Sequence, residues 1–117
     1  MQKYRYFVKL MVCTDEKFFG PGIVELLEGV QETHSLSKAS RRMSLAYTKA
    51  LKMIRNAEAA LGFKLLVPKI GGEGGGGSEL TEKAKCAMAA YGRYYDEVKA
   101  AAEEGFEEYL MEIDRIR

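Results

Sequence analysis

The side chains that could do chemistry gather between His34 and Ile70, and nearly all of them are basic: Lys38, Arg41, Arg42, Lys49, Lys52, Arg55, Lys64 and Lys69. Glu58 is the only acid in this stretch. The net charge of the whole chain is only +1 because acids outnumber bases after Glu79. A DNA duplex carries about one negative charge per ~1.7 Å of axis, and a basic face that contacts it releases counterions. The pattern favours DNA binding, and the alternative is the solvated face of an ordinary pair of helices.

Catalytic and metal-binding patterns are weak in this sequence. His34 is the only histidine in the sequence. A Ser/His/Asp triad would have to use this one residue, and no pair of histidines is present to bind a metal. Cys13 and Cys86 are too few and too far apart for a zinc site or a disulfide framework. We expect no enzyme, no metal and no cofactor.

Two short helices must position the basic residues, and both lie within Ser35–Gly62. Ser35 and Ser37 are good N-cap residues for the first helix, and Gly62 suits the C-terminal cap of the second. Ser44 interrupts the helical pattern between them. The second helix, about 45–61, has apolar residues at three- and four-residue spacing: Tyr47, Ala50, Leu51, Ile54, Ala57 and Leu61. This arrangement predicts a helix-turn-helix whose second helix enters the major groove.

The helix pair needs a third element to cover its apolar faces. Ile23, Leu26, Leu27 and Val30 predict that helix, starting near Pro21. Upstream, residues 4–13 alternate with period two, which predicts a strand in a hairpin over 4–19. The face with Phe7 and Met11 is not polar, so we expect the long C-terminal helix or a second subunit to cover it.

A second hairpin, the wing, is predicted over 63–80. Phe63–Val67 suggests a strand with Pro68 at its edge, and GGEGGGGS (71–78) suggests a flexible tip. A phosphate-binding loop of the P-loop type would need Lys-Ser/Thr after its last glycine, and Ser78-Glu79-Leu80 stands there instead. A tip without side chains can approach a DNA backbone closely.

The last element is a long helix from Thr81 to about Asp114, which would span ~50 Å. A small domain cannot cover an apolar stripe of that length, so we expect the helix to pair with a second copy, although it could instead fold back over the N-terminal hairpin. The candidate interface residues are Met88, Tyr91, Tyr95, Val98, Phe106 and Leu110.

The predicted fold class is therefore α+β, mainly α: a winged helix-turn-helix domain over 1–80 and a dimerisation helix over 81–117. No apolar run approaches the ~20 residues that a membrane helix needs. The first ten residues lack the apolar core of a signal peptide, so we expect a cytoplasmic protein.

Four motifs in order resemble the N-terminal domain of the molybdate-responsive ModE-type regulators, within the wider LysR-like winged-helix group: FGPG (19–22), SLSKAS (35–40), AYTKA (46–50) and GGEGGGGS leading into LTE (71–82). The resemblance runs from about Phe18 to about Lys85. His34 and Ser44 stand where that family usually has glycine. The resemblance implies a DNA-binding winged helix with a dimerising linker helix. The chain ends with its long helix, so we expect no molybdate-binding domains.

The expected function is a homodimeric, sequence-specific regulator that binds double-stranded DNA. The alternative is a dimeric protein-interaction adaptor that has kept the fold without binding DNA. Salt-dependent binding to duplex separates the two. The candidate DNA-binding residues are Ser35, Ser37, Lys38, Arg41, Ala46, Tyr47, Thr48, Lys49, Lys52, Arg55, Lys69, Gly74 and Gly75.

Overall fold

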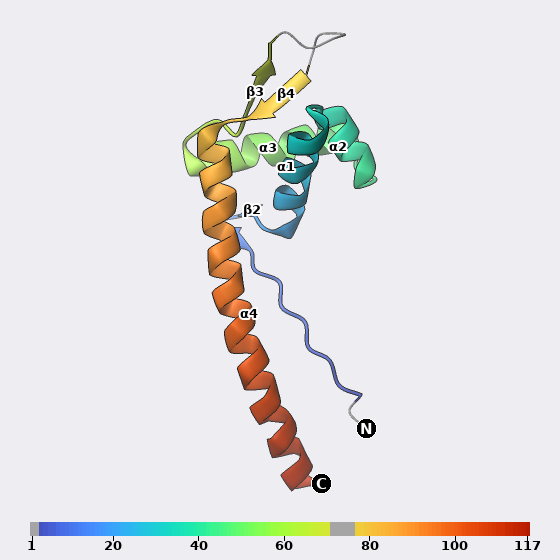
Figure 1. Ribbon diagram of the computed structural model, residues 1–117, viewed down its shortest axis with the longest axis vertical. Coiled ribbons are helices and arrows are strands. Elements are labelled where there is room, and N and C mark those ends of the chain that lie inside the picture. The colour runs from blue at the N-terminus through green and yellow to red at the C-terminus, as the bar shows by residue number, and fades with distance from the viewer. Residues whose placement is uncertain (1–2, 71–76) are drawn as a thin grey trace.

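The computed structural model describes residues 3–70 and 77–117, and the molecule measures 63 × 28 × 23 Å. A small helical domain lies at one end, and one long helix projects from it (Figure 1). The order of elements in the described residues is β1 (Val12–Cys13), β2 (Lys17–Phe19), α1 (Pro21–Thr33), α2 (Leu36–Arg42), α3 (Tyr47–Leu61), β3 (Leu66–Lys69), β4 (Gly77–Leu80) and α4 (Glu82–Ile116).

Helices α1, α2 and α3 enclose the core, as the apolar spacing predicts. The apolar stripe of α1 is buried, and Ala50, Ile54 and Ala57 of α3 face it. Helices α1 and α2 approach closely at Gly29, where an added Cβ would lie 2.8 Å from the Cβ of Ala39. The predicted helix-turn-helix is therefore present, with the third helix that it needs.

The turns on either side of α2 depend on residues with left-handed backbone. His34 ends α1 with φ 57°, and Ser44 lies between α2 and α3 with φ 56°. Gly62 caps α3 with φ 83°, as expected for a C-terminal glycine. The resemblance leads one to expect glycine at both His34 and Ser44, and their positive φ values give the physical reason.

The wing is present, but its first strand begins later than predicted. Strand β3 starts at Leu66 instead of Phe63, and Pro68 lies within it, paired with Ser78 of β4. Leu65 lies outside the strand because its amide donates to the Glu58 side chain and not to a strand partner, and its side chain is fully buried. Residues 71–76, which include Gly74 and Gly75, lie outside the described residues.

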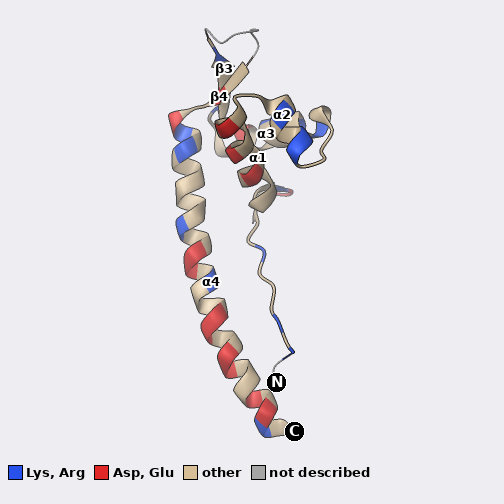
Figure 2. Ribbon diagram, turned by 45° about the vertical axis from the view of Figure 1, so that its right-hand side comes forward, with Lys and Arg blue, Asp and Glu red and all other residues tan. Residues whose placement is uncertain are grey.

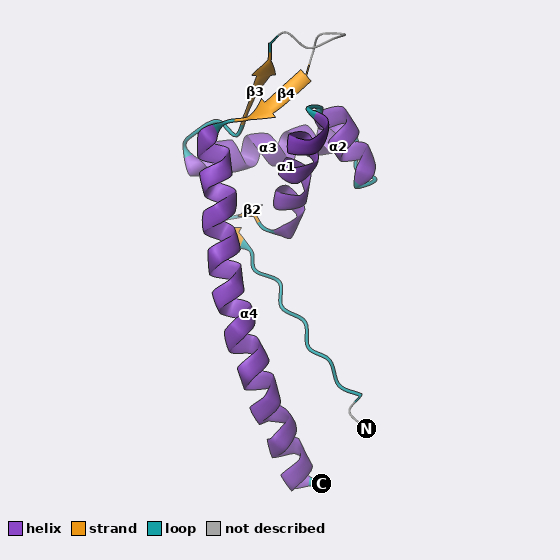
Figure 3. Cartoon of the chain, in the orientation of Figure 1, coloured by secondary structure: helices purple, strands orange, loops and turns teal. Residues whose placement is uncertain are grey.

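The predicted N-terminal hairpin over 4–19 is wrong for most of its length. Only Val12–Cys13 pairs with Lys17–Phe19, because the return strand ends at Phe19 and α1 begins at Pro21. The segment 3–11 runs extended beside α4, and it pairs with no strand in the described part of the chain (Figures 1 and 3). Helix α4 does not cover Phe7, whose side chain is 88% exposed in the single chain, and cover by a second subunit stays a prediction.

Thr81 is the N-cap of helix α4, and its hydroxyl oxygen accepts a hydrogen bond from the amide of Ala84, as expected. The same hydroxyl donates to the carbonyl of Lys64, which ties the start of α4 to the base of the wing. The helix continues without interruption for 35 residues (Figure 3). No helix in ranges 3–70 and 77–117 is long and apolar enough to cross a membrane.

Candidate nucleic-acid interface

We use the name basic face for four exposed cations of α2 and α3 together with the exposed Thr48: Lys38, Arg41, Thr48, Lys52 and Arg55. All five side chains are exposed. None of the four cations lies within 4.0 Å of a carboxylate in the described part of the chain. Figure 2 shows basic residues on α2, while acids gather on α1 and on the distal part of α4. The folded chain therefore separates its charges, although its total is nearly neutral.

Arg42 differs from its neighbours because an acid of α1 neutralises it. Its Nη1 lies 2.6 Å from the Oε1 of Glu32, and both side chains are largely exposed. This ion pair links the end of α2 to α1. Arg42 therefore belongs to the packing of the two helices and not to the basic face.

Glu58, the only acid of the segment, is turned away from the basic face. Its carboxylate accepts hydrogen bonds from the backbone amides of Leu65 at 2.8 Å and Leu66 at 3.4 Å. Its side chain is only 13% exposed, and the ammonium of Lys64 lies 3.9 Å from its other oxygen. The withdrawal of Glu58 leaves the exposed surface of α3 without a negative charge.

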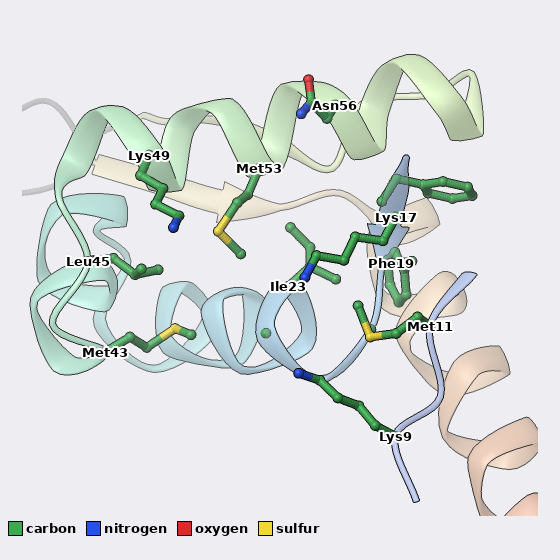
Figure 4. Close-up of a pocket in the computed structure, with 13 residues that line it drawn as sticks. Lys9, Met11, Lys17, Phe19, Ile23, Met43, Leu45, Lys49, Met53 and Asn56 are labelled. Carbon is green, nitrogen blue, oxygen red and sulfur yellow. The ribbon is translucent and has the colours of Figure 1, made fainter. Parts of the chain in front are cut away.

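The surface of α3 has two sides. Successive residues rotate by about 100° around a helix axis, so Thr48, Lys52 and Arg55 follow one side. Lys49 and Asn56 lie on the other side, next to Met53, where all three line a cavity (Figure 4). The sequence grouped Lys49 with Thr48, and the structure places Lys49 at the edge of the basic face.

Several predicted contact residues also serve the local fold. The hydroxyl of Ser35 caps α2 by accepting from the amide of Lys38 at 3.1 Å. Ser37 and Tyr47 are exposed, and Ala46 is the exposed N-cap residue of α3. The side chain of Lys69 on the wing is half-buried.

The wing is attached directly to the helix-turn-helix. The amide of Ser78 donates to the carbonyl of His34 at 2.9 Å. An added Cβ at Gly77 would lie 2.9 Å from the same carbonyl, so the strand passes too close for a side chain there. His34 therefore has two structural roles: it caps the end of α1, and its carbonyl fixes the wing relative to α1 and α2.

The predicted dimer residues divide into two groups. Tyr91 and Tyr95 hold the chain's own N-terminal segment, because their hydroxyls donate to the carbonyls of Leu10 (2.9 Å) and Val8 (3.1 Å). Phe106 packs on Tyr6 with ring centroids 4.8 Å apart. Met88, Val98 and Leu110 are half-buried. The assignment of these residues to a dimer stays a prediction.

Two of these tyrosines have altered acidity. Burial raises the pKa of Tyr91 above its ordinary 10.0, with a further contribution from the neighbouring Tyr95. Burial also raises the pKa of Tyr6, and the nearby carboxylate of Glu103 adds to the effect by accepting its hydrogen bond at 3.3 Å. Both shifts favour the neutral phenol, which is the form that donates these hydrogen bonds.

Comparisons with known proteins give one distant structural similarity, which carries no argument about this chain. No protein-family model matches the sequence, and no curated protein matches it. One solved structure, titled "Crystal structure of CbnR_DBD-DNA complex", is similar at 23% identity and a TM-score of 0.48, covering 69% of this chain and 95% of that chain. At this level the winged-helix assignment depends on the geometry of this chain itself, and the ModE-type resemblance stays a prediction.

Within the described residues no group of three or more histidine, cysteine or carboxylate side chains could hold a metal ion. The arrangement that the structure does bring together is an exposed cationic surface on a helix-turn-helix, with a hairpin wing fixed beside it.

Proposed function

We propose that this chain binds double-stranded DNA as a transcriptional regulator and reads sequence by placing α3 in the major groove. The observation that carries the proposal is the basic face: exposed cations on α2 and α3 that make no ion pair with a described carboxylate, and from which Glu58 is turned away. The major groove of a duplex admits one α-helix. Counterion release favours binding of an unneutralised cationic surface to the phosphates.

Roles follow from position on the two helices. Thr48 and Lys52 lie in the first two turns of α3, where a recognition helix contacts base edges, and Arg55 continues the same side. Lys38 and Arg41 on α2 would contact phosphates and set the orientation of the domain. Ala46, exposed at the start of α3, could meet a thymine methyl group, and the half-exposed Tyr47 could reach a phosphate.

We further propose that the regulator is a homodimer assembled through α4. The described part of this helix exposes Tyr94, Tyr109, Met111 and Ile116 in addition to its half-buried stripe. Long helices with apolar surface usually pair with a partner. A two-fold dimer would select an inverted-repeat operator, and two linked domains would gain affinity through effective concentration.

A protein-interaction adaptor is the alternative, and one observation favours it. An apolar groove of about 370 Å³ lies between the end of α3 and α4, lined by Val12, Phe18, Phe19, Leu61, Phe63, Ala87, Ala90, Tyr91 and Tyr94. Such a groove could receive an apolar side chain from another protein. It lies away from the basic face, so a role in assembly and a role in DNA binding are compatible.

The test is a binding selection on random duplex DNA followed by titration of the selected site at several salt concentrations. The proposal requires enrichment of a defined sequence and a linear fall of log affinity with log salt concentration. Weak binding to every duplex without enrichment would contradict sequence-specific reading. No measurable binding at low salt would favour the adaptor.

A further inference from the structure

A cavity of about 320 Å³ lies beside the basic face, between α3, the start of α1 and strand β2 (Figure 4). We propose that it binds a small carboxylate with an apolar body, such as an alkyl or aryl acid, and that the bound acid weakens binding to DNA. The second part of this proposal rests on the proposed function. The volume falls at the lower end of the range typical of sites for small organic ligands.

The lining of the cavity is apolar and adaptable. Met11, Met43 and Met53 reach it from the N-terminal segment, the α2–α3 turn and α3, and Ile23 lies between them (Figure 4). Methionine side chains are unbranched and polarisable, so they adjust to ligands of different shape. Met53 lies close to Gly22, where an added Cβ would be 3.7 Å from its terminal methyl group.

Three lysines surround this apolar lining. Lys9, Lys17 and Lys49 come from three different segments, and their ammonium ends point toward the same space (Figure 4). None of the three makes an ion pair with a described carboxylate, and no described acid lines the cavity. Asn56 adds a neutral polar group at the rim.

This combination selects an anion that also has an apolar part. A metal cation would be repelled by the three ammonium groups, even though thioethers are ligands for soft metals. A neutral apolar molecule would make no ionic contact with the lysines. An inorganic anion would make no apolar contact with the methionines and Ile23. A carboxylate on an alkyl or aryl body satisfies both groups of residues.

Lys49 connects the cavity to the basic face. It lies on α3 one residue after Thr48 and three before Lys52. An acid bound in the cavity would neutralise part of the cationic charge near the groove and hold the side chain of Lys49 away from DNA. With fewer cations facing the phosphates, fewer counterions are released on binding. The complex is therefore weaker, and its affinity falls less steeply with salt concentration.

Direct binding is tested first, without DNA. Methionine methyl groups labelled with ¹³C are observed by NMR while octanoate is added to the full chain. Met11, Met43 and Met53 should shift in a saturable way at millimolar octanoate, whereas Met88 and Met111 on α4 should not. Acetate, inorganic phosphate and 1-octanol each lack one of the two required features and should bind much more weakly. Equal shifts at all methionines, no saturable shift, or equal binding of phosphate or octanol would overturn the site.

Two variants locate the site. Gly22→Leu fills the cavity and should abolish the three shifts, while Gly105→Leu adds the same bulk where nothing lies within 4 Å of an added Cβ and should retain them. Lys17→Met keeps the apolar chain without the charge and should weaken octanoate about two- to fivefold, as expected for an exposed ion pair. Unchanged octanoate affinity in a folded Gly22→Leu protein would overturn the assignment, and Lys17→Met decides it if Gly22→Leu does not fold.

Coupling to DNA is tested last, with the operator obtained by selection. Saturating octanoate should lower duplex affinity several-fold in the original protein and leave Gly22→Leu unaffected. Equal duplex affinity with and without bound octanoate would overturn the coupling while the site stands. A protein that binds octanoate but no duplex would keep the site and overturn both the coupling and the proposed function.

Discussion

The carboxylate of Glu58 accepts a hydrogen bond from the amide of Leu65, 2.8 Å away, and this contact joins the last turn of α3 to the start of the wing. Leu65 is fully buried, and its carbonyl accepts from the amide of Thr81 at the start of α4. Glu58 therefore fixes the backbone of Leu65, which in turn contacts the start of α4. The same contact keeps a negative charge off the basic face.

Glu58→Ala should destabilise the fold by about 1–3 kcal/mol, because it removes a charged acceptor and leaves a buried amide without its partner. Glu58→Gln keeps an acceptor of the same shape and should cost less. Thermal or urea unfolding of both variants measures the difference. Equal stability of the original protein and Glu58→Ala would show that the contact does not stabilise the domain.

His34→Gly and Ser44→Gly should not destabilise the protein, since both positions have positive φ. Left-handed backbone costs a residue with a Cβ about 1–2 kcal/mol, and the added freedom of glycine in the unfolded chain offsets part of the gain. Gly62→Ala is the opposite control and should lower stability by about 1 kcal/mol, because glycine has φ 83° there with open space around it. Denaturant unfolding of the three variants measures whether the free energy of unfolding rises or falls in each.

Lys52→Ala and Lys38→Ala should weaken DNA binding in different ways. Lys52 is expected to contact a base, so its loss should cost about 1–3 kcal/mol and relax preference at one operator position. Lys38 is expected to contact phosphate, so its loss should weaken all duplexes similarly and reduce the salt slope by about 1. Lys85→Ala on α4 removes the same charge outside the basic face and is the control. If neither of the first two variants differs from Lys85→Ala in a titration, α2 and α3 do not bind the duplex.

Tyr91→Phe should destabilise the fold by about 1 kcal/mol, because the carbonyl of Leu10 loses its donor. The pKa of Tyr91 is raised in the folded state, so the fold favours the neutral phenol. The associated stability is complete below pH 10.0 and is lost as pH rises above it. Unfolding measured between neutral pH and pH above 10 should show a smaller alkaline loss for Tyr91→Phe than for the original protein. Identical pH dependence of the two proteins would exclude this linkage.

Val98→Asp tests the proposed dimer with little disturbance of the single chain, since Val98 is half-buried on α4 and lies outside the buried core cluster. In a paired helix the new charge would be buried without a partner, which costs several kcal/mol, roughly 3–5, unless the pair separates. We expect sedimentation to show a dimer for the original protein and a monomer for Val98→Asp. Ala100→Asp, on the exposed opposite side of α4, is the control. A monomeric original protein would remove the dimer and the inverted-repeat operator from the proposal.

The sequence by itself determined the helical part of this protein. Apolar spacing is a local property of each helix, so the positions of α1, α3 and α4 followed from residues within each segment. Cap residues such as Thr81 and Gly62 also act within one turn of the helix that they end. The basic composition of α2 and α3 was likewise visible without a structure.

Tertiary structure decided the features that depend on distant partners. Alternation over 4–13 indicated a strand, but a strand needs a neighbour for its backbone, and the return segment ends at Phe19. Instead, the hydroxyls of Tyr91 and Tyr95 on α4 donate hydrogen bonds to backbone carbonyls of this segment, which lies more than 80 residues earlier in the sequence. The direction of Glu58, and the meeting of Lys9, Lys17 and Lys49 around one cavity, also depend on how separate elements pack. The spacing of residues within a single helix or strand does not predict these contacts between separate elements.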